Sequence, residues 1–450
     1  MNQLQIFLPC AAGVEDYLCG EVQTITDLPA QSIQRWRGGV MLQGSWRAVL
    51  LLNLHCRLAQ RVMVQLSLTD YRSEQDLYRA AAAVAWEIWF TPKQSIKVEV
   101  TAQHSPLTSL NFAALKVKDA VCDRFRDKAQ GVRPDVNTRW PDVRIFAHLT
   151  TDQCALYIDT SGEALFKRGW REDTGDAPLK ETLAAAMIAA SGWADGDADL
   201  LPLYDPCCGS GTVAIEAAQI ACNIPPGLLR QFAFEKYLPF QAHVWQAIRE
   251  EAKARIIHPE PGDAPLIYGS DVSHRMVDFA ERNAQRAGVA GVISFRGGDA
   301  LQRMPPIEGG GVMLLNPPYG ERIEVGGVAG KGARFGAREV AETEEGGAFF
   351  NQLAGHWKKH FSGWSAWVLT PDLKLPGKMR LKESRRVPLW NGPIECRLFR
   401  FDLVAGRMDK SKVGADAQPD ALGASAAPAR SKERAEPTAP ETAQARPASA

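Results

Sequence analysis

The stretch Asp205-Pro-Cys-Cys-Gly-Ser-Gly-Thr-Val-Ala-Ile-Glu-Ala-Ala218 constrains the fold of this chain more than any other. It follows the apolar run from Leu200 to Tyr204 and continues into an alanine-rich segment with apolar residues at helical spacing. The pattern predicts a strand, a glycine turn and a helix. Such a turn lies at the carboxyl end of a parallel strand, where open α/β sheets bind their ligands. The sequence therefore predicts an α/β domain with a ligand site at this turn.

The residue types in the turn indicate the ligand's chemistry. Gly209 and Gly211 allow close approach of the backbone, and the free amides of the next helical turn favour a carboxylate or phosphate. Asp205 can pair with an amine, so the methionine end of S-adenosylmethionine (SAM), with its ammonium and carboxylate, fits the turn. Gly209-x-Gly211-x-x-Ala214 also satisfies the dinucleotide-binding pattern. That alternative lacks an acidic ribose ligand about 20 residues later, where Pro225 stands instead.

Asp205-Pro-x-Cys-Gly-Ser-Gly-Thr212 resembles motif I of class I SAM-dependent methyltransferases, in the form used by RNA guanine-N2 methyltransferases. The resemblance implies a Rossmann-like methyltransferase domain with a seven-stranded mixed sheet and SAM as cofactor. Cys207 and Cys208 are also expected to be small buried residues rather than nucleophiles. The expected cofactor ligands in the turn are Asp205, Cys207, Gly209, Ser210, Gly211 and Thr212.

Two further acidic residues follow predicted strands. Asp271 stands at the tip of the second strand, which the sequence predicts over 266–269, where its carboxylate can accept both ribose hydroxyls. Asp299 follows the third strand, predicted over 292–295. The resemblance implies that Asp299 accepts from the adenine amine, and a turn aspartate is the alternative.

The most specific chemical signal is Asn316-Pro-Pro-Tyr-Gly-Glu-Arg322, which follows a continuous apolar strand. Two successive prolines remove backbone donors and fix φ, so the Asn316 amide oxygen and the Pro317 carbonyl can both accept from one planar amine. Two acceptors keep electron density on a weakly nucleophilic nitrogen as the C–N bond forms. Tyr319 offers a ring on which a base can stack. The predicted catalytic residues are Asn316, which also contacts the cofactor, Pro317, Pro318 and Tyr319.

The tetrapeptide from Asn316 to Tyr319 does not identify the substrate, because similar motifs occur in DNA adenine-N6, protein glutamine-N5 and RNA guanine-N2 methyltransferases. The stretch from Leu115 to Phe125, with Gly131-Val-Arg-Pro134 after it, is similar to the RNA-binding THUMP domain of the last group. The resemblance implies a stand-alone enzyme that methylates guanine N2 in large-subunit (23S) ribosomal RNA. A tRNA guanine-N2 methyltransferase is the alternative, and a non-catalytic RNA-binding or ribosome-assembly factor is the alternative from another class.

The expected domains are a ferredoxin-like segment (1–45), a THUMP RNA-binding domain (46–160), the methyltransferase domain (161–404) and a disordered tail (405–450). Acidic residues interleave with the cations around residue 120, so a solvated helix face is the alternative to RNA contact there. Arg168, Arg171 and Lys180 are candidates for contact with RNA phosphates or with the segment that links the domains, and surface charges without such a role are the alternative. The expected RNA-binding residues are Lys116, Lys118, Arg124, Arg133, Arg168 and Arg171.

The formal net charge is zero, so nucleic-acid binding must come from local basic patches. Nine cysteines without a C-x-x-C pair argue against a disulfide framework and a zinc ribbon. No run approaches the roughly 20 apolar residues of a membrane span. We therefore expect a cytoplasmic protein with RNA as its partner and no membrane or metal, and the oligomeric state stays open.

Overall fold

The computed structural model describes residues 3–175, 178–195, 200–260, 262–317 and 343–404, with the backbone alone for 343–347. Pro318, Tyr319 and the tail predicted at 405–450 lie outside the described residues.

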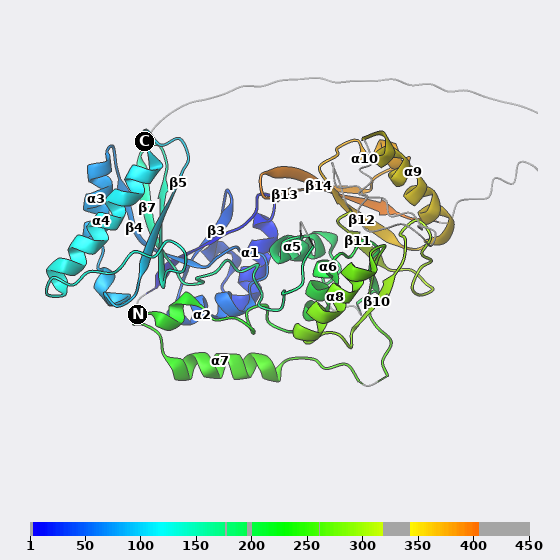
Figure 1. Cartoon of the computed structure of the whole chain (residues 1–450), viewed down its shortest axis with the longest axis horizontal. Helices are drawn as coiled ribbons and strands as arrows, with labels where there is room; N and C mark the ends of the chain where they lie inside the picture. Colours follow the sequence, from blue (N-terminus) through cyan, green and yellow to red (C-terminus); the bar gives the residue numbers. More distant parts are fainter. Residues whose placement is uncertain (1–2, 176–177, 196–199, 261, 318–342, 405–450) are drawn as a thin grey trace, which may run out of the picture. The chain divides into compact units, whose positions relative to one another are not determined.

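The first 160 residues contain one sheet with the strand order β2-β3-β1-β4-β7-β6-β5 (Figure 1). Neighbours are antiparallel except β5 and β6, which are parallel. Strands from both sides of residue 45 belong to this sheet, so the sheet does not mark the domain boundary expected there. That boundary stays a prediction. The strands are β1 (Leu4–Pro9), β2 (Ile33–Trp36), β3 (Gly39–Gly44), β4 (Met63–Asp70), β5 (Ile96–Ala102), β6 (Val143–Leu149) and β7 (Gln153–Asp159).

Helices pack on this sheet, and the spacing of the buried residues reflects the type of element, as β6 and α4 show. In β6, alternate residues from Val143 to Leu149 are buried, as expected for a strand with one face on a core. In α4, the buried residues recur at helical spacing, and the helix packs against α3 and β5. The helices are α1 (Glu15–Thr26), α2 (Trp46–His55), α3 (Glu74–Ala83) and α4 (Leu110–Lys128), with 3-10 turns at Ala30–Ser32 and Trp86–Ile88.

The second sheet has the order β10-β9-β8-β11-β12-β14-β13. The pairs from β10 to β12 are parallel, and β14 and β13 close the sheet antiparallel. This confirms the predicted seven-stranded mixed sheet of a class I methyltransferase. The strands are β8 (Leu203–Asp205), β9 (Ile267–Asp271), β10 (Ile293–Gly297), β11 (Val312–Leu315), β12 (Ser365–Thr370), β13 (Arg385–Asn391) and β14 (Ile394–Asp402).

Helices cover both faces of the second sheet, so its central strands are buried on both sides. All four residues of β11 are buried: Leu314 shares a core with α5, α6 and α8, whereas Met313 and Leu315 share one with α9 and α10. The helices are α5 (Glu181–Ser191), α6 (Thr212–Ala221), α7 (Ala242–Ala254), α8 (His274–Arg286), α9 (Thr343–His360) and α10 (Leu375–Met379), with a 3-10 turn at Ala233–Lys236.

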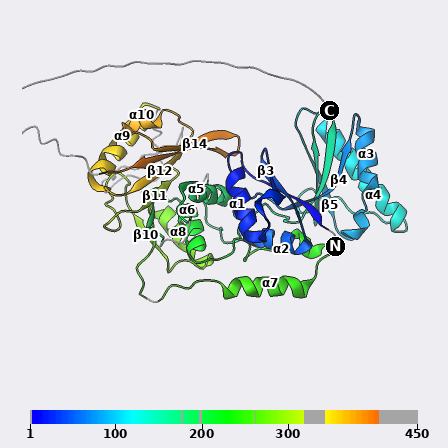
Figure 2. The same ribbon diagram turned by 180° about the vertical axis from the view of Figure 1, so that it is seen from behind.

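The segment between α6 and β9 attaches the second sheet to the N-terminal region. Figures 1 and 2 show α7 running beside α2, and Arg47 of α2 forms an ion pair with Glu251 of α7 at 3.5 Å. Phe234 packs edge-on against Trp46 with 6.4 Å between ring centroids, and the Leu238 N–H donates to the Trp89 carbonyl at 2.8 Å. This insertion therefore packs against the N-terminal helices and also places the second strand far from the first in sequence.

Candidate active site

The glycine turn and the Asn316 loop start at adjacent points of one sheet edge. β8 and β11 are parallel neighbours, with Leu203 opposite Val312 and Tyr204 opposite Met313. Because both strands end there, the turn after Asp205 and the loop that begins at Asn316 leave the sheet side by side. The predicted chemistry depends on this adjacency, and the sheet order supplies it.

The two glycines of the turn serve different needs. Both adopt left-handed backbone conformations, with φ of +53° at Gly209 and +87° at Gly211, which favours glycine. A Cβ on Gly211 would lie 2.9 Å from the Cβ of Ala280 in α8, so this glycine lets the turn pack on that helix. A Cβ on Gly209 would meet no atom within 4 Å. Gly209 therefore borders open space in which a ligand can lie.

Two acids, Asp205 and Asp271, flank that turn. Asp205 is 2% exposed and accepts from the Cys207 N–H at 3.1 Å, while Asp271 accepts from the N–H groups of Gly209 and Ser273, both at 2.9 Å. Burial, together with the nearby charge of Asp271, raises the pKa of Asp205 to about 8. Burial also raises the pKa of Asp271.

No described Lys or Arg lies within 4.0 Å of either carboxylate. A buried carboxylate is costly unless a cation or enough hydrogen bonds compensate it. Asp205 and Asp271 therefore suit a cationic ligand that also carries hydroxyl donors, which is the donor set that SAM would bring.

The side-chain oxygen Oδ1 of Asn316 is buried and, among the described residues, has no hydrogen-bond partner. Buried acceptors in native proteins are nearly always satisfied, so this oxygen is available to a donor from a bound group. Pro317 beside it is buried. The orphan acceptor fits the predicted role of binding an amine, and Pro318 and Tyr319 cannot be placed because they lie outside the described residues.

Asp299 lies in the turn after β10 and is half-buried. Its Oδ1 accepts from the Leu301 N–H at 2.9 Å, and its carbonyl accepts from the N–H groups of Gln302 and Arg303 at 3.0 Å. These contacts show the turn-forming role that the sequence left as the alternative. Its contact with adenine stays a prediction.

Ser210 and Thr212 are held by Arg171, a residue that the sequence assigned to RNA. The Arg171 guanidinium donates to Ser210 Oγ at 2.9 Å and to Thr212 Oγ1 at 2.8 Å, and it pairs with Glu181 at 2.8 Å. Arg171 also donates to the Leu179 carbonyl at 3.3 Å, which is the linker contact that the sequence allowed for it. Glu181, which sequence reasoning missed, is signalled only as an acid in the first turn of an otherwise apolar helix.

The prediction that Arg168 contacts RNA is wrong, because this side chain is 1% exposed. Its Nε donates to Glu216 of α6 at 3.0 Å, and its Nη2 donates to the Arg57 carbonyl at 2.8 Å. Arg57 also pairs with Glu216, at 3.3 Å. Arg168 therefore joins the N-terminal region to the helix that follows the glycine turn.

The four cations expected to bind RNA from the N-terminal region differ in their availability. Arg124 pairs with Glu87 at 2.6 Å and donates to the Ala82 carbonyl at 2.9 Å, so it has a structural role. Lys118 pairs with its neighbour Asp119 at 2.5 Å. The remaining two, Lys116 and Arg133, have no carboxylate partner among the described residues.

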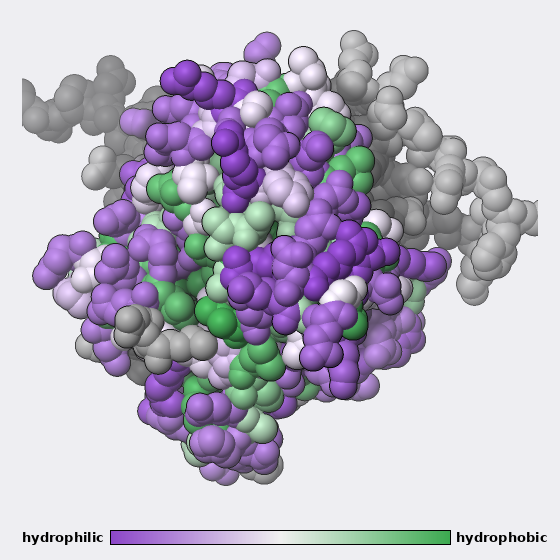
Figure 3. All heavy atoms as spheres, turned by 90° about the vertical axis from the view of Figure 1, so that its left-hand side faces the viewer, coloured by the Kyte–Doolittle hydropathy of each residue, from purple (hydrophilic) through white to green (hydrophobic). Residues whose placement is uncertain are grey.

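Exposed apolar residues accompany Lys116 on α4. Figure 3 looks onto the side where α3 and α4 lie and shows apolar patches among hydrophilic residues. Phe112 and Leu115 of α4 are exposed, and the Lys116 ammonium lies 5.4 Å from the Phe112 ring centroid. A cation beside an exposed ring is a suitable surface for stacked bases, and the RNA role of Lys116 stays a prediction.

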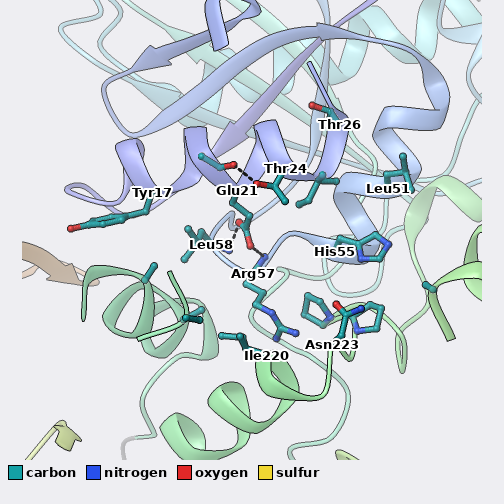
Figure 4. A pocket seen from close by; sticks show the side chains of 18 of the residues that line it. Tyr17, Glu21, Thr24, Thr26, Leu51, His55, Arg57, Leu58, Ile220 and Asn223 are labelled. Atoms are coloured by element: carbon teal, nitrogen blue, oxygen red, sulfur yellow. Dashed lines mark hydrogen bonds between the residues drawn. The ribbon is translucent and has the colours of Figure 1, made fainter. Parts of the chain in front are cut away.

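A cavity of about 1130 Å³ lies away from these motifs, between α1, α2, α5 and the segment after α6 (Figure 4). Glu21 on its wall accepts from the N–H groups of Arg57 and Leu58, at 2.7 and 3.1 Å. In Figure 4, the Arg57 side chain points toward Ile220 and Asn223. Both acidic and basic residues line this cavity, and none of the motif residues does.

Among the described residues, no three His, Cys, Asp or Glu side chains gather into a metal site. None of the described helices has both the length and the apolar character needed to cross a membrane.

The fold and the site together define a class I methyltransferase domain attached to an N-terminal domain pair. Residues 5–63 match the RlmL ferredoxin-like domain, residues 71–159 match the THUMP domain, and residues 168–330 match the RMKL-like methyltransferase domain. The chain thus combines a region similar to the RlmL ferredoxin-like domain, a THUMP domain and an RMKL-like methyltransferase domain.

Curated relatives share this arrangement over most of the chain. The ribosomal RNA large subunit methyltransferase K/L of Shewanella amazonensis is 38% identical over 400 residues, covering 89% of this chain and 53% of its own length. The protein of the same name from Syntrophotalea carbinolica is 35% identical over 420 residues, covering 92% and 55%. The chain thus spans about half the length of the curated relatives it matches.

Solved structures agree on the fold. SMU.472 complexed with SAH has a TM-score of 0.76 and 27% identity, covering 91% of this chain and all of that one. A "predicted N6-adenine-specific DNA methylase" from Listeria monocytogenes has a TM-score of 0.75 and 28% identity, covering 89% and 96%. TrmN from Thermus thermophilus, at 18% identity and a TM-score of 0.60 over 89% of this chain and all of its own, shares the fold alone.

Proposed function

We propose that this protein transfers the methyl group of SAM to the exocyclic N2 amine of a guanine in large-subunit ribosomal RNA. One observation carries the proposal. The neighbouring strands β8 and β11 place a buried acid without a described cationic partner, Asp205, beside a buried acceptor without a described donor, Asn316. The first suits the donor molecule and the second suits the amine that receives the methyl group.

The donor side uses the glycine turn and the two acids. Asp205 would pair with the ammonium of SAM, and the first amides of α6 would face its carboxylate. Asp271 would accept from the ribose hydroxyls at the tip of β9 while keeping its bond to Gly209. When bound, SAM supplies a methyl group on a sulfonium, which is already activated for transfer.

On the acceptor side, Asn316 Oδ1 and the carbonyl of Pro317 would accept from the two hydrogens of the guanine amine. These bonds keep electron density on nitrogen and place it in line with the methyl group. The developing positive charge on nitrogen strengthens both bonds, so they favour the transition state over the ground state. Pro318 and Tyr319 keep their proposed roles in stiffening the loop and stacking the base.

The choice of RNA rests on the THUMP domain at 71–159 and on the names of the curated relatives. A cytoplasmic location follows from that choice and belongs to the same proposal. The Listeria structure is described as acting on DNA adenine, so the methyltransferase fold by itself does not select the base.

Transfer of labelled methyl groups tests the proposal. Purified protein is incubated with labelled SAM and, separately, with unmodified 23S ribosomal RNA, large subunits, tRNA and DNA, and the product nucleosides are identified. We expect N2-methylguanosine in ribosomal RNA. Label in tRNA alone would favour the tRNA alternative, and label in DNA alone would overturn the RNA assignment. If the protein binds RNA but transfers no methyl group, or if it binds RNA and calorimetry detects no SAM binding, a non-catalytic assembly factor is favoured.

A further inference from the structure

A second groove, of about 630 Å³, lies beside the segment that links the THUMP domain to the methyltransferase domain. Residues from the linker, from the start of α5 and from the insertion after α6 line it. Its cationic lining residues are Lys167, Arg168, Arg171, Lys180 and Arg230.

Carboxylates neutralise three of these cations. The ion pairs are Lys167 with Glu163 at 2.6 Å, Arg168 with Glu216 at 3.0 Å and Arg171 with Glu181 at 2.8 Å. Within the part of the chain that the structure describes, no carboxylate lies within 4.0 Å of the other two, Lys180 and Arg230. The groove therefore carries an uncompensated positive charge.

Arg230 is the more unusual of the two, since it is only 8% exposed. Its two terminal nitrogens donate to the carbonyls of Ala164, Lys167 and Glu163 at 2.7–2.9 Å, and its Nε has no partner among the described residues. Burial lowers the pKa of Arg230 to about 10, so it stays charged at neutral pH. Its guanidinium also lies 5.0 Å from the centroid of the Phe232 ring. A buried cation without a carboxylate partner is nevertheless costly, and an anion in the groove would offset that cost.

Lys180 contributes a second, exposed charge to the lining of the groove. It is exposed and stands immediately before α5, and its ammonium lies 5.3 Å from the centroid of the Phe166 ring. The positive end of the α5 dipole adds to the same field. A guanidinium, an ammonium and a helix start are together the chemistry that binds phosphate oxygens.

We propose that this groove binds a backbone phosphate of the RNA substrate next to the nucleotide that is methylated. The assignment rests on the proposed function for its choice of RNA. The groove is much larger than one phosphate and runs along the linker, which suits a continuous strand. Arg171 lines the groove and also donates to Ser210 and Thr212 of the glycine turn. An RNA strand in the groove would therefore be separated from the glycine turn by the Arg171 side chain.

The test measures RNA affinity and its salt dependence in full-length protein carrying Lys180→Gln. We expect Kd for 23S RNA fragments to rise about 3- to 10-fold. The slope of log Kd against log salt should fall by about one, the amount that corresponds to the loss of one ionic contact. The Kd for SAM should not change, because Lys180 contacts no residue of the glycine turn in the described structure. Lys359→Gln, an exposed lysine of α9, is the matched control and should leave both quantities unchanged.

Arg230→Lys supplies a second arm, with thermal unfolding as a check because Arg230 also ties three linker carbonyls. Retained folding with weaker RNA binding supports the groove. The third arm adds inorganic phosphate to wild-type protein and to Lys180→Gln. If phosphate raises the Tm of the wild type only, yet RNA affinity is equal in both proteins, the groove serves a free phosphate compound and the RNA assignment is overturned.

If neither RNA nor phosphate responds to Lys180→Gln, the groove binds no anion and the inference is wrong. Methyl transfer at saturating RNA reports the proposed function separately. A variant that still forms N2-methylguanosine at the normal maximal rate shows that the catalytic assignment survives failure of the groove. Wild-type protein that makes no such product would instead remove the proposed function.

Discussion

The Gly209 N–H donates to Oδ2 of Asp271 at 2.9 Å and thereby joins the glycine turn after β8 to the tip of β9. The other oxygen of Asp271 accepts from Ser273 at the start of α8. One carboxylate therefore ties the glycine turn to the start of α8. The donor site is largely formed by backbone contacts before any ligand binds.

This contact predicts separate effects for two substitutions of Asp271. Asp271→Ala removes the ribose acceptor and the bond to Gly209, so the Kd for SAM should rise by 100-fold or more, about 3 kcal/mol. Asp271→Asn keeps one acceptor oxygen and should lose less. Isothermal titration calorimetry measures both, and an unchanged Kd in Asp271→Ala would show that the ribose lies elsewhere.

Asn316→Ala should lower kcat by about 10²- to 10³-fold while the Kd for SAM stays within a factor of about two, since an amine acceptor acts mainly in the transition state. The stability of the unliganded protein should not fall much, because Oδ1 of Asn316 has no described partner to lose. Single-turnover methyl transfer and thermal unfolding give the two readouts. Normal turnover in Asn316→Ala would remove the assigned mechanism.

Asp205 should make cofactor binding depend on pH. Its pKa is raised to about 8, so the carboxyl is protonated at neutral pH in the unliganded protein and must ionise to pair with a cation. SAM affinity should therefore rise between about pH 6 and 8, by up to tenfold per unit, with release of a proton.

Unliganded stability should show the opposite trend. The folded state keeps a proton that the unfolded state loses near pH 4, so this contribution is full below pH 4 and is lost as pH rises through 8. Calorimetry in buffers of different ionisation enthalpy counts the proton, and Asp205→Asn should flatten both profiles. A flat profile in the wild type would mean that Asp205 is already ionised.

Local motifs in the sequence predicted that the glycine turn and the Asn316 loop leave one sheet edge, because the fold places strand ends predictably. Once β8 and β11 were recognised as parallel strands, Asp205 and Asn316 had to leave the same sheet edge. Helix ends were less predictable. The sequence suggests one helix over 74–88, but α3 ends at Ala83, and the Trp86 indole N–H donates to the Ala81 carbonyl that a longer helix would use.

Charged residues were the main failure, because charge alone predicts exposure. Arg168 is buried by a partner, Glu216, that lies 48 residues later on a different element. Nothing local distinguishes Arg168 from Lys167, which is exposed. The one available signal was Glu216, an acid within the apolar run that follows the glycine turn. Its position suggests that it needs a buried cation, but it does not identify Arg168 as that cation.

The reassignment of Arg168 makes its own prediction. Arg168→Met leaves Glu216 buried with only Arg57 as cation, so the free energy of unfolding should fall by about 3 kcal/mol. RNA affinity of the folded fraction should not change. Arg126→Met, which removes a surface pair with Asp123, should cost less than about 1 kcal/mol. Urea unfolding and RNA titration decide the matter, and a specific loss of RNA affinity in Arg168→Met would restore the original assignment.

The two turn glycines give a matched pair for separating fold from binding. Gly211→Ala adds a Cβ 2.9 Å from Ala280 at a φ of +87°, so it should destabilise the unliganded protein by about 2 to 4 kcal/mol. Gly209→Ala meets no atom within 4 Å and should cost only the backbone strain, about 1 to 2 kcal/mol. Its added methyl group enters the open space, so SAM affinity should fall more than stability does.

Thermal unfolding with and without SAM separates the two effects. The cofactor should raise the Tm of Gly211→Ala by nearly as much as it raises the Tm of the wild type, and it should raise the Tm of Gly209→Ala by much less. Equal increments in both variants would show that the space beside Gly209 does not hold the cofactor.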